Sequence, residues 1–193
     1  LQRAIRGIAS SAASGQLPTP IANLLLREPP ALTTPGLPAV ADDDFVGAIT
    51  EAVRALDDST LAVQGPPGSG KTHTAAHVIA RLVKDDGWRV GVVSQGHSAV
   101  NHLLDGIVKA GVDPERVGKK DKPEGCLWRD VATAKTAEFL ADHEGIGCVL
   151  GGTAWDFASD RVGPAQLDLL VVDEAGQFSL ANTIAVLIRL GSI

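Results

Sequence analysis

The stretch Leu61-Ala-Val-Gln-Gly-Pro-Pro-Gly-Ser-Gly-Lys-Thr72 fits the pattern G-x-x-x-x-G-K-[S/T] from Gly65 to Thr72. A short apolar run leads into the glycines. Behind them, apolar residues recur at the spacing of a helix, at Ala75, Ala76, Ile79, Leu82 and Val83. A strand, a glycine-rich loop and a helix in this order make a phosphate-binding loop. We therefore predict a P-loop at this position.

The loop residues suit a nucleoside triphosphate. Glycines at 65, 68 and 70 let backbone N–H groups approach phosphate oxygens without a clash from a Cβ atom, and the helix that begins near Gly70 adds its positive end. Lys71 is expected to reach the β- and γ-phosphates, and the hydroxyl of Thr72 to bind Mg²⁺. The predicted ATP-binding set is Gly65, Pro66, Pro67, Gly68, Ser69, Gly70, Lys71, Thr72 and His73.

A second motif supplies the carboxylates that a P-loop enzyme needs. Leu167-Asp-Leu-Leu-Val-Val-Asp173 reads as a buried parallel strand that ends in an acid, and Glu174 follows it. Asp173 is expected to hold the water shell of Mg²⁺, together with Thr72. Glu174 is placed to polarise the attacking water. Two adjacent carboxylates favour hydrolysis over a nucleotide kinase, which needs no water-activating base.

Strands alternate with helices along most of the chain, which predicts an α/β fold with a doubly wound parallel sheet. The expected strands are 61–64, 89–93, 148–150 and 167–173. The expected helices are 1–28, 42–56, the helix after the P-loop, the one around 100–107, then 131–142 and 179–190. Prolines between 27 and 38 forbid a regular element there. We predict an N-terminal helical segment and linker over 1–40 and a nucleotide-binding domain over 41–193.

Composition limits the classes of protein and of binding partner that remain. The 193 residues carry a net charge of −6, which argues against a permanently basic surface but not against a local basic groove. No apolar run has the length of a membrane span, so we expect no membrane partner. Cys126 and Cys148 lie far apart and read as free cytosolic thiols, which predicts a cytoplasmic protein. The chain begins at Leu1 and contains no methionine, so we expect a piece of a longer protein.

Taken together, Gly65–Thr72 and Asp173-Glu-Ala-Gly-Gln177 resemble superfamily 1 helicases of the 5′→3′ branch, which includes the nonsense-mediated-decay and Okazaki-flap helicases. The resemblance implies a P-loop NTPase fold with a RecA-like parallel sheet flanked by helices, and it covers about residues 45–190. It also implies ATP and Mg²⁺ as cofactors. Lys71, Glu174 and Gln177 are then the catalytic residues, with Gln177 coupling the γ-phosphate to domain movement.

The same resemblance implies contacts to single-stranded nucleic acid, with DNA expected more than RNA. The segment from Val92 to Leu104 is similar to the family's motif Ia, and Thr153 follows the third strand where another strand-end motif is expected. The implied nucleic-acid-binding residues are Ser94, Gln95, Gly96, His97, Asn101 and Thr153. Motif Ia is similar to that of bacterial proteins that fuse a RecB-like nuclease to such a helicase.

The sequence departs from the family pattern in three ways. The usual proline of motif Ia is replaced near Gln95. Residues 42–56 contain no glutamine, although the family usually reads adenine with one in that helix. The sequence ends at Ile193, before the second RecA-like domain, whose arginines accelerate hydrolysis by on the order of 10³–10⁵ in related NTPases. That domain of the parent chain is therefore an expected partner. Two alternatives stay open: a nucleotide-gated nucleic-acid-binding module that does not hydrolyse ATP on its own, and a P-loop kinase or other non-helicase ATPase.

Three weaker signals each allow two interpretations. His73 and His77 lie one helical turn apart, and surface or packing roles are favoured over a metal site. The basic cluster Arg116, Lys119, Lys120 and Lys122 is expected to be a solvated loop rather than a phosphate contact. Trp155 and Phe157 are expected to pack in the core behind the third strand rather than to stack on bases.

Overall fold

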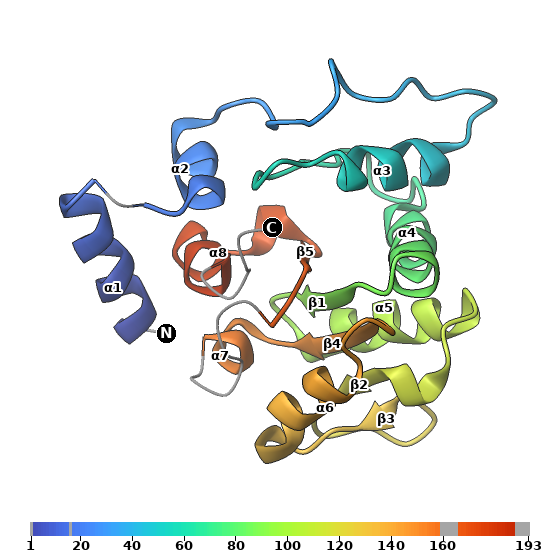
Figure 1. Ribbon diagram of the computed structural model, residues 1–193. Coiled ribbons are helices and arrows are strands. Elements are labelled where there is room, and N and C mark those ends of the chain that lie inside the picture. The colour runs from blue at the N-terminus through green and yellow to red at the C-terminus, as the bar shows by residue number, and fades with distance from the viewer. Residues whose placement is uncertain (1, 16, 159–165, 188–193) are drawn as a thin grey trace.

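The computed structural model describes residues 2–15, 17–158 and 166–187 (Figure 1). Its helices are α1 (Gln2–Ala13), α2 (Thr19–Leu26), α3 (Phe45–Arg54), α4 (Lys71–Asp85), α5 (His97–Lys109), α6 (Thr136–Asp142), α7 (Ala154–Phe157) and α8 (Leu180–Leu187). Its strands are β1 (Arg89–Val93), β2 (Val117–Lys119), β3 (Arg129–Asp130), β4 (Cys148–Gly152) and β5 (Leu169–Val172). Short 3-10 turns cover Pro114–Arg116, Thr133–Lys135 and Ala175–Gln177.

The five strands form one parallel sheet in the order β3-β2-β4-β1-β5. β1 lies between β4 and β5, with Val92 opposite Gly151 on one side and Val171 on the other. Parallel strands need crossover connections, and helices supply them on both sides of the sheet. The predicted α/β fold with a helix-flanked parallel sheet is confirmed.

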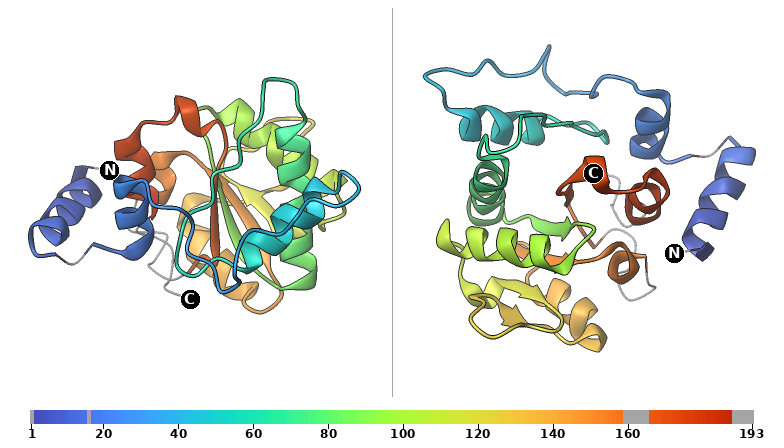
Figure 2. Two further views of the ribbon diagram at one scale, coloured as in Figure 1. Left: turned by 90° about the horizontal axis from the view of Figure 1, so that it is seen from above. Right: turned by 180° about the vertical axis from the view of Figure 1, so that it is seen from behind.

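Alternating side chains divide the core into two layers, one on each face of the sheet. Val90, Val92 and Val149 pack against α4 and α5 on one face. Val93 and Leu150 point to the other face, where α6, α7 and α8 pack. Figure 2 shows the helices on the two sides of the strands. A Cβ atom on Gly151 would lie 2.6 Å from Leu104 Cδ1, so glycine is needed where α5 approaches β4.

The strand predicted at Leu61–Gln64 is wrong. These residues form no strand. Within the described residues β5 is therefore an edge strand of the sheet, next to β1. Leu61 packs in one apolar cluster with Leu169 of β5, but the next three residues are exposed, including Val63 at 51%. Pro66 and Pro67 follow at once, and proline has no N–H to donate to a strand ladder. The apolar run therefore leads into the loop without joining the sheet.

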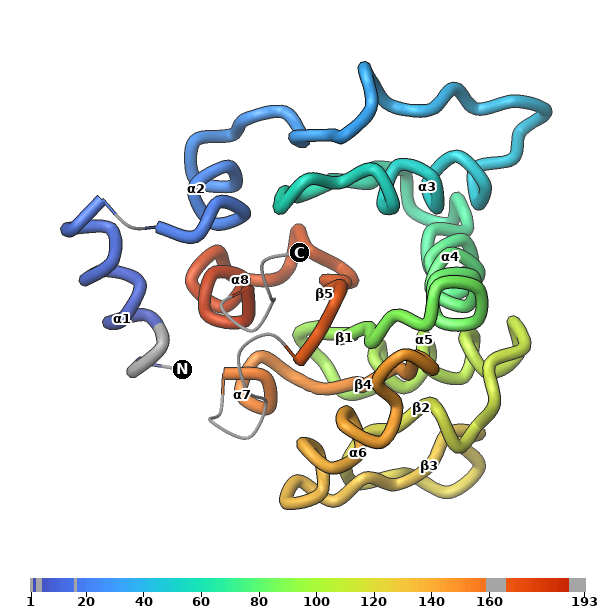
Figure 3. Tube along the Cα trace, viewed as in Figure 1, coloured from blue at the N-terminus to red at the C-terminus, as the bar shows by residue number. Residues whose placement is uncertain are grey.

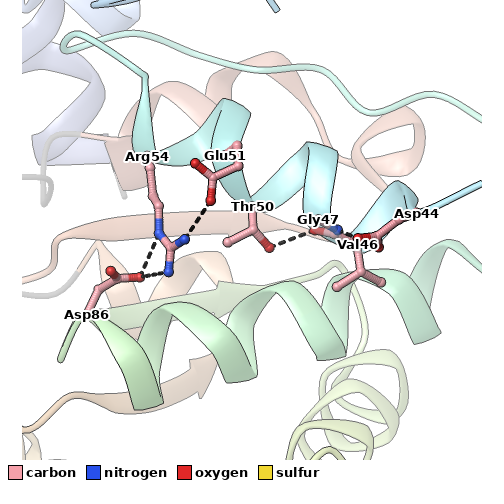
Figure 4. A network of polar contacts seen from close by, with 7 residues as sticks. All are labelled: Asp44, Val46, Gly47, Thr50, Glu51, Arg54 and Asp86. Carbon is pink, nitrogen blue, oxygen red and sulfur yellow. Dashed lines mark hydrogen bonds and ion pairs between the residues drawn. The ribbon is translucent and has the colours of Figure 1, made fainter. Parts of the chain in front are cut away.

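Helix α3 is fastened to α4, the helix that follows the P-loop (Figure 4). The Asp44 side chain caps α3 by accepting a hydrogen bond from Gly47 N at 2.8 Å, as its predicted place at the helix start suggests. Arg54 ends α3 and forms an ion pair with Asp86, with 2.8 Å between Nη2 and Oδ2, and a second with Glu51. α4 thus has support on the side that faces away from α5.

The N-terminal segment packs on the last helix. The single helical stretch predicted over 1–28 is two helices, α1 and α2. Ile8, Ile21 and Leu187 form an apolar cluster that joins both helices to α8. The chain then runs as a connection without helix or strand, as predicted for 27–38, apart from a bridge between Leu32 and Leu56, and reaches α3 (Figure 3). The division of the chain at residue 40 stays a prediction.

The other predicted elements are present with shifted bounds. The helix expected over 131–142 begins only at Thr136, and two short strands, β2 and β3, precede it. The last helix is described as far as Leu187, and residues 188–190 of that prediction lie outside the described residues. Within the described ranges, no helix has both the length and the apolar character to cross a membrane.

Candidate functional site

The glycine loop leaves open space where a phosphate is expected. Gly68 and Gly70 have φ angles of 77° and 79°, which side chains other than glycine rarely adopt. A Cβ atom built on either residue meets no atom within 4 Å. Gly70 is the N-cap residue of α4, and no side chain caps this helix, so its first N–H groups face the loop. The loop therefore has the backbone geometry and the free space that an anion needs.

Lys71 is folded back on the loop. Its Nζ atom donates hydrogen bonds to the carbonyl oxygens of Gly65, at 2.7 Å, and Pro66, at 2.8 Å, and its side chain is exposed. Phosphate oxygens are stronger acceptors for an ammonium group than carbonyls, since they carry charge. The residue predicted to bind phosphate is thus held beside the glycines, in contact with carbonyls that an anion can replace.

The acidic pair lies directly after β5. The N–H of Asp173 donates to Val93 O at 2.9 Å, so Asp173 still belongs to the sheet ladder. Glu174 has a left-handed φ of 53°, its N–H donates to Asp173 Oδ1 at 3.0 Å, and its side chain is exposed. Gln177 closes the turn by donating its N–H to Glu174 O at 2.8 Å.

The two predicted motifs lie at the same end of the sheet. β1, β4 and β5 are parallel, so their carboxyl ends lie at the same end of the sheet. A predicted site residue follows each of these ends: Ser94, Thr153 and Asp173. Figure 2 (left) shows the segment that enters α4 at the end of the sheet where β5 leads to α8. Thr72 is half-buried in the first turn of α4. One hydroxyl and one carboxylate at this edge form a donor set that suits Mg²⁺, which keeps water and substrate oxygens as its other ligands.

No direct bond joins the two motifs in the described residues: Lys71 forms no ion pair with Asp173 or Glu174. His73 and His77, whose metal role was disfavoured, stack with ring centroids 4.3 Å apart. Across the described ranges, no group of three or more His, Cys, Asp or Glu side chains comes together. The ATP and Mg²⁺ roles of the individual residues stay predictions.

The segment predicted to contact nucleic acid links β1 to α5. Gln95 and His97 are exposed, and Gly96 is the N-cap residue of α5. Ser94 is fully buried, and its Oγ has no hydrogen-bond partner; the buried Oδ1 of Asn101 has none either. Buried polar atoms normally find a partner. His77 Nδ1 and Trp128 Nε1 are two further buried atoms without one in the described residues, so this feature is not specific to the segment.

Thr153 is held by the helix that it begins. In the capping box at α7, the Thr153 N–H donates to Asp156 Oδ2 at 2.8 Å, and the Thr153 side chain accepts a hydrogen bond from the Asp156 N–H. The Thr153 hydroxyl also donates to Asp156 Oδ2 at 2.8 Å. Lys120, at the end of β2, forms an ion pair with Asp156 Oδ1 at 2.7 Å. Burial raises the pKa of Asp156, but the hydrogen bonds from Lys120 and Thr153 outweigh this and hold its pKa below the usual value. Asp156 is therefore a carboxylate that positions Thr153.

The basic cluster divides into separate roles. Arg116 is half-buried and donates hydrogen bonds to the backbone oxygens of Val83, Ile146 and Gly147, so it is structural. Lys119 is 1% exposed, with Nζ 5.5 Å from the Trp128 ring centroid, and burial lowers its pKa. The prediction of a solvated loop is wrong for these two residues.

The two aromatic residues of α7 also differ from each other. Phe157 is 1% exposed and packs with Val93 and Leu150, as predicted. Trp155 is 67% exposed, so the prediction that it packs in the core is wrong. Asp156 and Lys120 were missed as a pair by sequence reasoning. The T-x-x-D spacing of Thr153 and Asp156 is a helix-start signal that could have identified half of it.

Comparison with known proteins gives one family match and several relatives. The AAA domain family matches residues 42–139. The protein "Regulator of nonsense transcripts 1 homolog" of Neurospora crassa is 29% identical over 126 residues, 65% of this chain and 10% of that protein. The protein of the same name in Drosophila melanogaster is 34% identical over 92 residues, 48% of this chain and 7% of that protein. "ATP-dependent helicase upf1" of Schizosaccharomyces pombe is 30% identical over 125 residues, 61% of this chain and 12% of that protein. The chain therefore spans about a tenth of the length of these relatives.

Proposed function

The chain belongs to the AAA domain family, and from this premise we propose that it is the ATP-binding motor domain of a superfamily 1 helicase. The motor couples Mg²⁺-dependent ATP hydrolysis to movement along single-stranded nucleic acid and to unwinding. The relative in S. pombe carries the name of an ATP-dependent helicase, which supports this proposal over a P-loop kinase or a non-helicase ATPase.

One observation carries the proposal. The open loop that contains Gly68 and Gly70 leads into α4 at the carboxyl end of the sheet. β5 ends at Val172 at the same end of the sheet, and Asp173 and Glu174 follow it. A nucleotide bound there has its phosphates at the start of α4, with Asp173 and Glu174 at the same end of the sheet. Phosphate-binding donors and carboxylates at one sheet edge are what hydrolysis of a nucleoside triphosphate requires.

Each residue has a separate role in this proposal. Backbone N–H groups of the loop hold the phosphates, and Lys71 exchanges the carbonyls of Gly65 and Pro66 for phosphate oxygens. Thr72 and Asp173 hold Mg²⁺, which neutralises phosphate charge when bound. Glu174 orients the attacking water and accepts its proton. Gln177 sits on the turn behind Glu174, where it senses the γ-phosphate.

The nucleic acid binds at the same sheet edge, on the side of β1 and β4. We assign the contacts to Ser94, Gln95, Gly96, His97, Asn101 and Thr153. The names of the relatives refer to nonsense transcripts, which are RNA, and give no support to the expected preference for DNA. RNA is therefore the strand to test first. The nuclease fusion and the cytoplasmic location stay predictions without such support.

The nucleotide site is tested by calorimetry with Mg·ATP. Lys71→Ala should weaken ATP binding by at least about tenfold, because the charged partner of the phosphates is gone. Lys84→Ala removes an exposed lysine from the far end of the same helix and should change nothing. Equal affinity of the Lys71→Ala variant and the unchanged chain would overturn the assignment of the loop.

Turnover separates the helicase motor from the alternative of a nucleotide-gated binding module. In the longest natural form of the protein, Glu174→Gln should leave ATP bound but stop hydrolysis, because an amide accepts no proton from water. We propose that a second RecA-like domain of that form supplies the arginines that accelerate hydrolysis. If the full protein binds ATP and single strands but never hydrolyses ATP, the binding module is the correct function.

A further inference from the structure

We propose that Trp155 is a base-stacking residue for single-stranded nucleic acid, placed at the end of the sheet where β4 leads into α7. The inference rests on the proposed function, because it assumes that a single strand crosses this edge of the sheet. It adds a residue that the motifs do not include. It also names the part of the strand that is contacted, which is the face of a base.

The exposure of Trp155 follows from how α7 packs. Ala154 and Phe157 are three positions apart and both buried, so they form the inner face of this short helix. Trp155 lies on the outer side and leaves 67% of its surface exposed. By contrast, Trp128 is fully buried and Trp88 is partly buried in the core. An indole is a large apolar surface, and most such surfaces are covered in a folded protein.

The backbone at Trp155 is also fixed. The capping box fixes the start of α7 through reciprocal hydrogen bonds between Thr153 and Asp156, and Phe157 anchors the end of the helix in the core. A rigid aromatic loses little conformational entropy when a ligand stacks on it. The residue beside Thr153, itself proposed to contact the strand, is therefore a preorganised platform.

The surrounding charges suit a polyanion. The carboxylate of Asp156, next to Trp155 in sequence, is paired with Lys120 and hydrogen-bonded to Thr153, so its negative charge is compensated. Lys120 is one-third exposed at the end of β2, and Lys122 is exposed in the loop that follows. Because β4 lies between β2 and β1, α7 follows β4 between the segment that carries these lysines, after β2, and the start of α5 at His97, after β1. Bases that stack on an aromatic flanked by cations are the usual arrangement in single-strand sites.

Intrinsic fluorescence tests the proposal directly, because stacking of a base quenches indole emission. The chain is titrated with single-stranded oligouridylate and oligothymidylate of about 15 nucleotides, a length that spans a typical site. Binding should quench the emission, and Trp155→Phe should remove that quenching while it keeps most of the affinity, since phenylalanine also stacks. Trp155→Ala should weaken binding by about five- to a hundredfold. Leu26→Ala, a variant of an apolar residue on α2 that is 69% exposed, should bind as the unchanged chain does.

An abasic strand of the same length separates stacking from contacts to the backbone. The unchanged chain and Trp155→Ala should bind this strand equally, because it has no bases to stack. Circular dichroism verifies that the variant is folded, which its exposed position favours. If the unchanged chain binds oligouridylate and Trp155→Ala binds it equally well, the stacking role is wrong and Trp155 is covered by another partner. If the unchanged chain binds no single strand at all, the proposed function itself fails.

Discussion

The ammonium group of Lys71 donates a 2.7 Å hydrogen bond to the carbonyl oxygen of Gly65, six residues earlier in the same loop. This bond closes the loop around its own lysine. A Cβ atom on Gly65 would lie 2.8 Å from Ser69 Oγ, so the hydroxyl of Ser69 would have to move in a variant with a side chain here. The loop therefore keeps its lysine in place before any anion arrives, and a bound phosphate needs only to replace carbonyl acceptors.

Replacing Gly70 with alanine should affect stability and binding for different reasons. At a φ of 79°, alanine adds backbone strain of about 1 kcal/mol to the folded state. The new methyl group also points into space that is open for a phosphate, so ATP affinity should fall by at least about tenfold. Urea unfolding measures the first effect and calorimetry the second.

Gly36→Ala is the matched control, because its Cβ atom also meets nothing within 4 Å and its φ is not positive. Gly36 lies in the proline-rich connection, away from the loop. Gly36→Ala should change neither the free energy of unfolding nor the ATP affinity. Full ATP affinity in the Gly70→Ala variant would show that the open space is not the phosphate site.

The Asp156 carboxylate should stabilise the fold in a pH-dependent way. Its pKa in the folded state is lowered, since the hydrogen bonds from Lys120 and Thr153 outweigh the opposing effect of burial. Its contribution is therefore present above the unfolded value of about 3.9 and is lost as the pH falls through the folded pKa. Asp156→Asn should lower the free energy of unfolding by about 1 kcal/mol at neutral pH and by almost nothing in strong acid.

Urea unfolding at several pH values measures this difference. Glu124→Gln, an exposed carboxylate in the loop before β3, is the control and should show no pH-dependent loss. A constant difference between Asp156→Asn and the unchanged chain down to strong acid would contradict the ion pair with Lys120 as its cause.

The elements that could be predicted are those whose signal is local. α4 and α5 carry apolar residues at helical spacing, and β1 is a short run of valines. β2 was missed because it has three residues, contains a glycine and ends in a lysine. Gly118 is required there by a neighbour distant in sequence: a Cβ atom would lie 2.5 Å from Val131 Cγ2. The strand wrongly predicted at 61–64 shows that a local signal can also mislead, because an apolar run becomes a strand only where partner strands cover it.

The candidate site divides in the same manner. The loop and the acidic pair are contiguous motifs, so the sequence identifies them directly. The link between Lys120 and Asp156 joins the residue after β2 to helix α7, which follows β4, and the pairing of β2 with β4 brings the two together. Burial is equally non-local: Trp155 and Phe157 are two aromatic residues only two positions apart, and packing in the core covers only Phe157.

Arg116 should be needed for stability and not for strand binding. Its guanidinium donates to Gly147 O at 2.8 Å and Val83 O at 2.9 Å, and it also contacts Ile146 O. Lysine cannot reproduce this fork, so Arg116→Lys should lower the free energy of unfolding by about 1–3 kcal/mol. The salt dependence of oligouridylate binding should keep its slope, because no phosphate contact is lost.

Chemical denaturation and binding at several salt concentrations test these two statements. Arg81→Lys, an exposed arginine on α4, should leave stability within about 0.5 kcal/mol of the unchanged chain. A reduced salt slope in the Arg116→Lys variant would instead place Arg116 on the nucleic acid.

The two thiols should react at different rates. Cys148 is fully buried in β4, and burial raises its pKa to about 12, so almost no thiolate forms near neutral pH. Cys126 is half-buried, and its pKa is raised less far. Native labelling with a thiol reagent near pH 8 should therefore modify Cys126 first, and Cys148 only when the chain unfolds. Mass spectrometry of timed samples identifies the labelled site. Rapid labelling of Cys148 in the Cys126→Ala variant would contradict this order.

Lys119 is a buried cation whose removal should not weaken the fold. Its Nζ donates one hydrogen bond, to Lys120 O at 3.1 Å, and lies over the Trp128 ring. Burial lowers its pKa, so the folded state disfavours the charged form, and stability should rise as the pH climbs from the folded pKa towards the unfolded value of about 10.4.

Lys119→Met keeps the volume and removes the charge, so the free energy of unfolding at neutral pH should stay equal or increase, and its rise at alkaline pH should disappear. Lys122→Met, at an exposed neighbour, should keep that rise. Urea unfolding between neutral and alkaline pH measures both variants. A loss of more than about 2 kcal/mol in Lys119→Met would mean that the attraction between the ammonium group and the Trp128 ring outweighs the penalty of burying the charge.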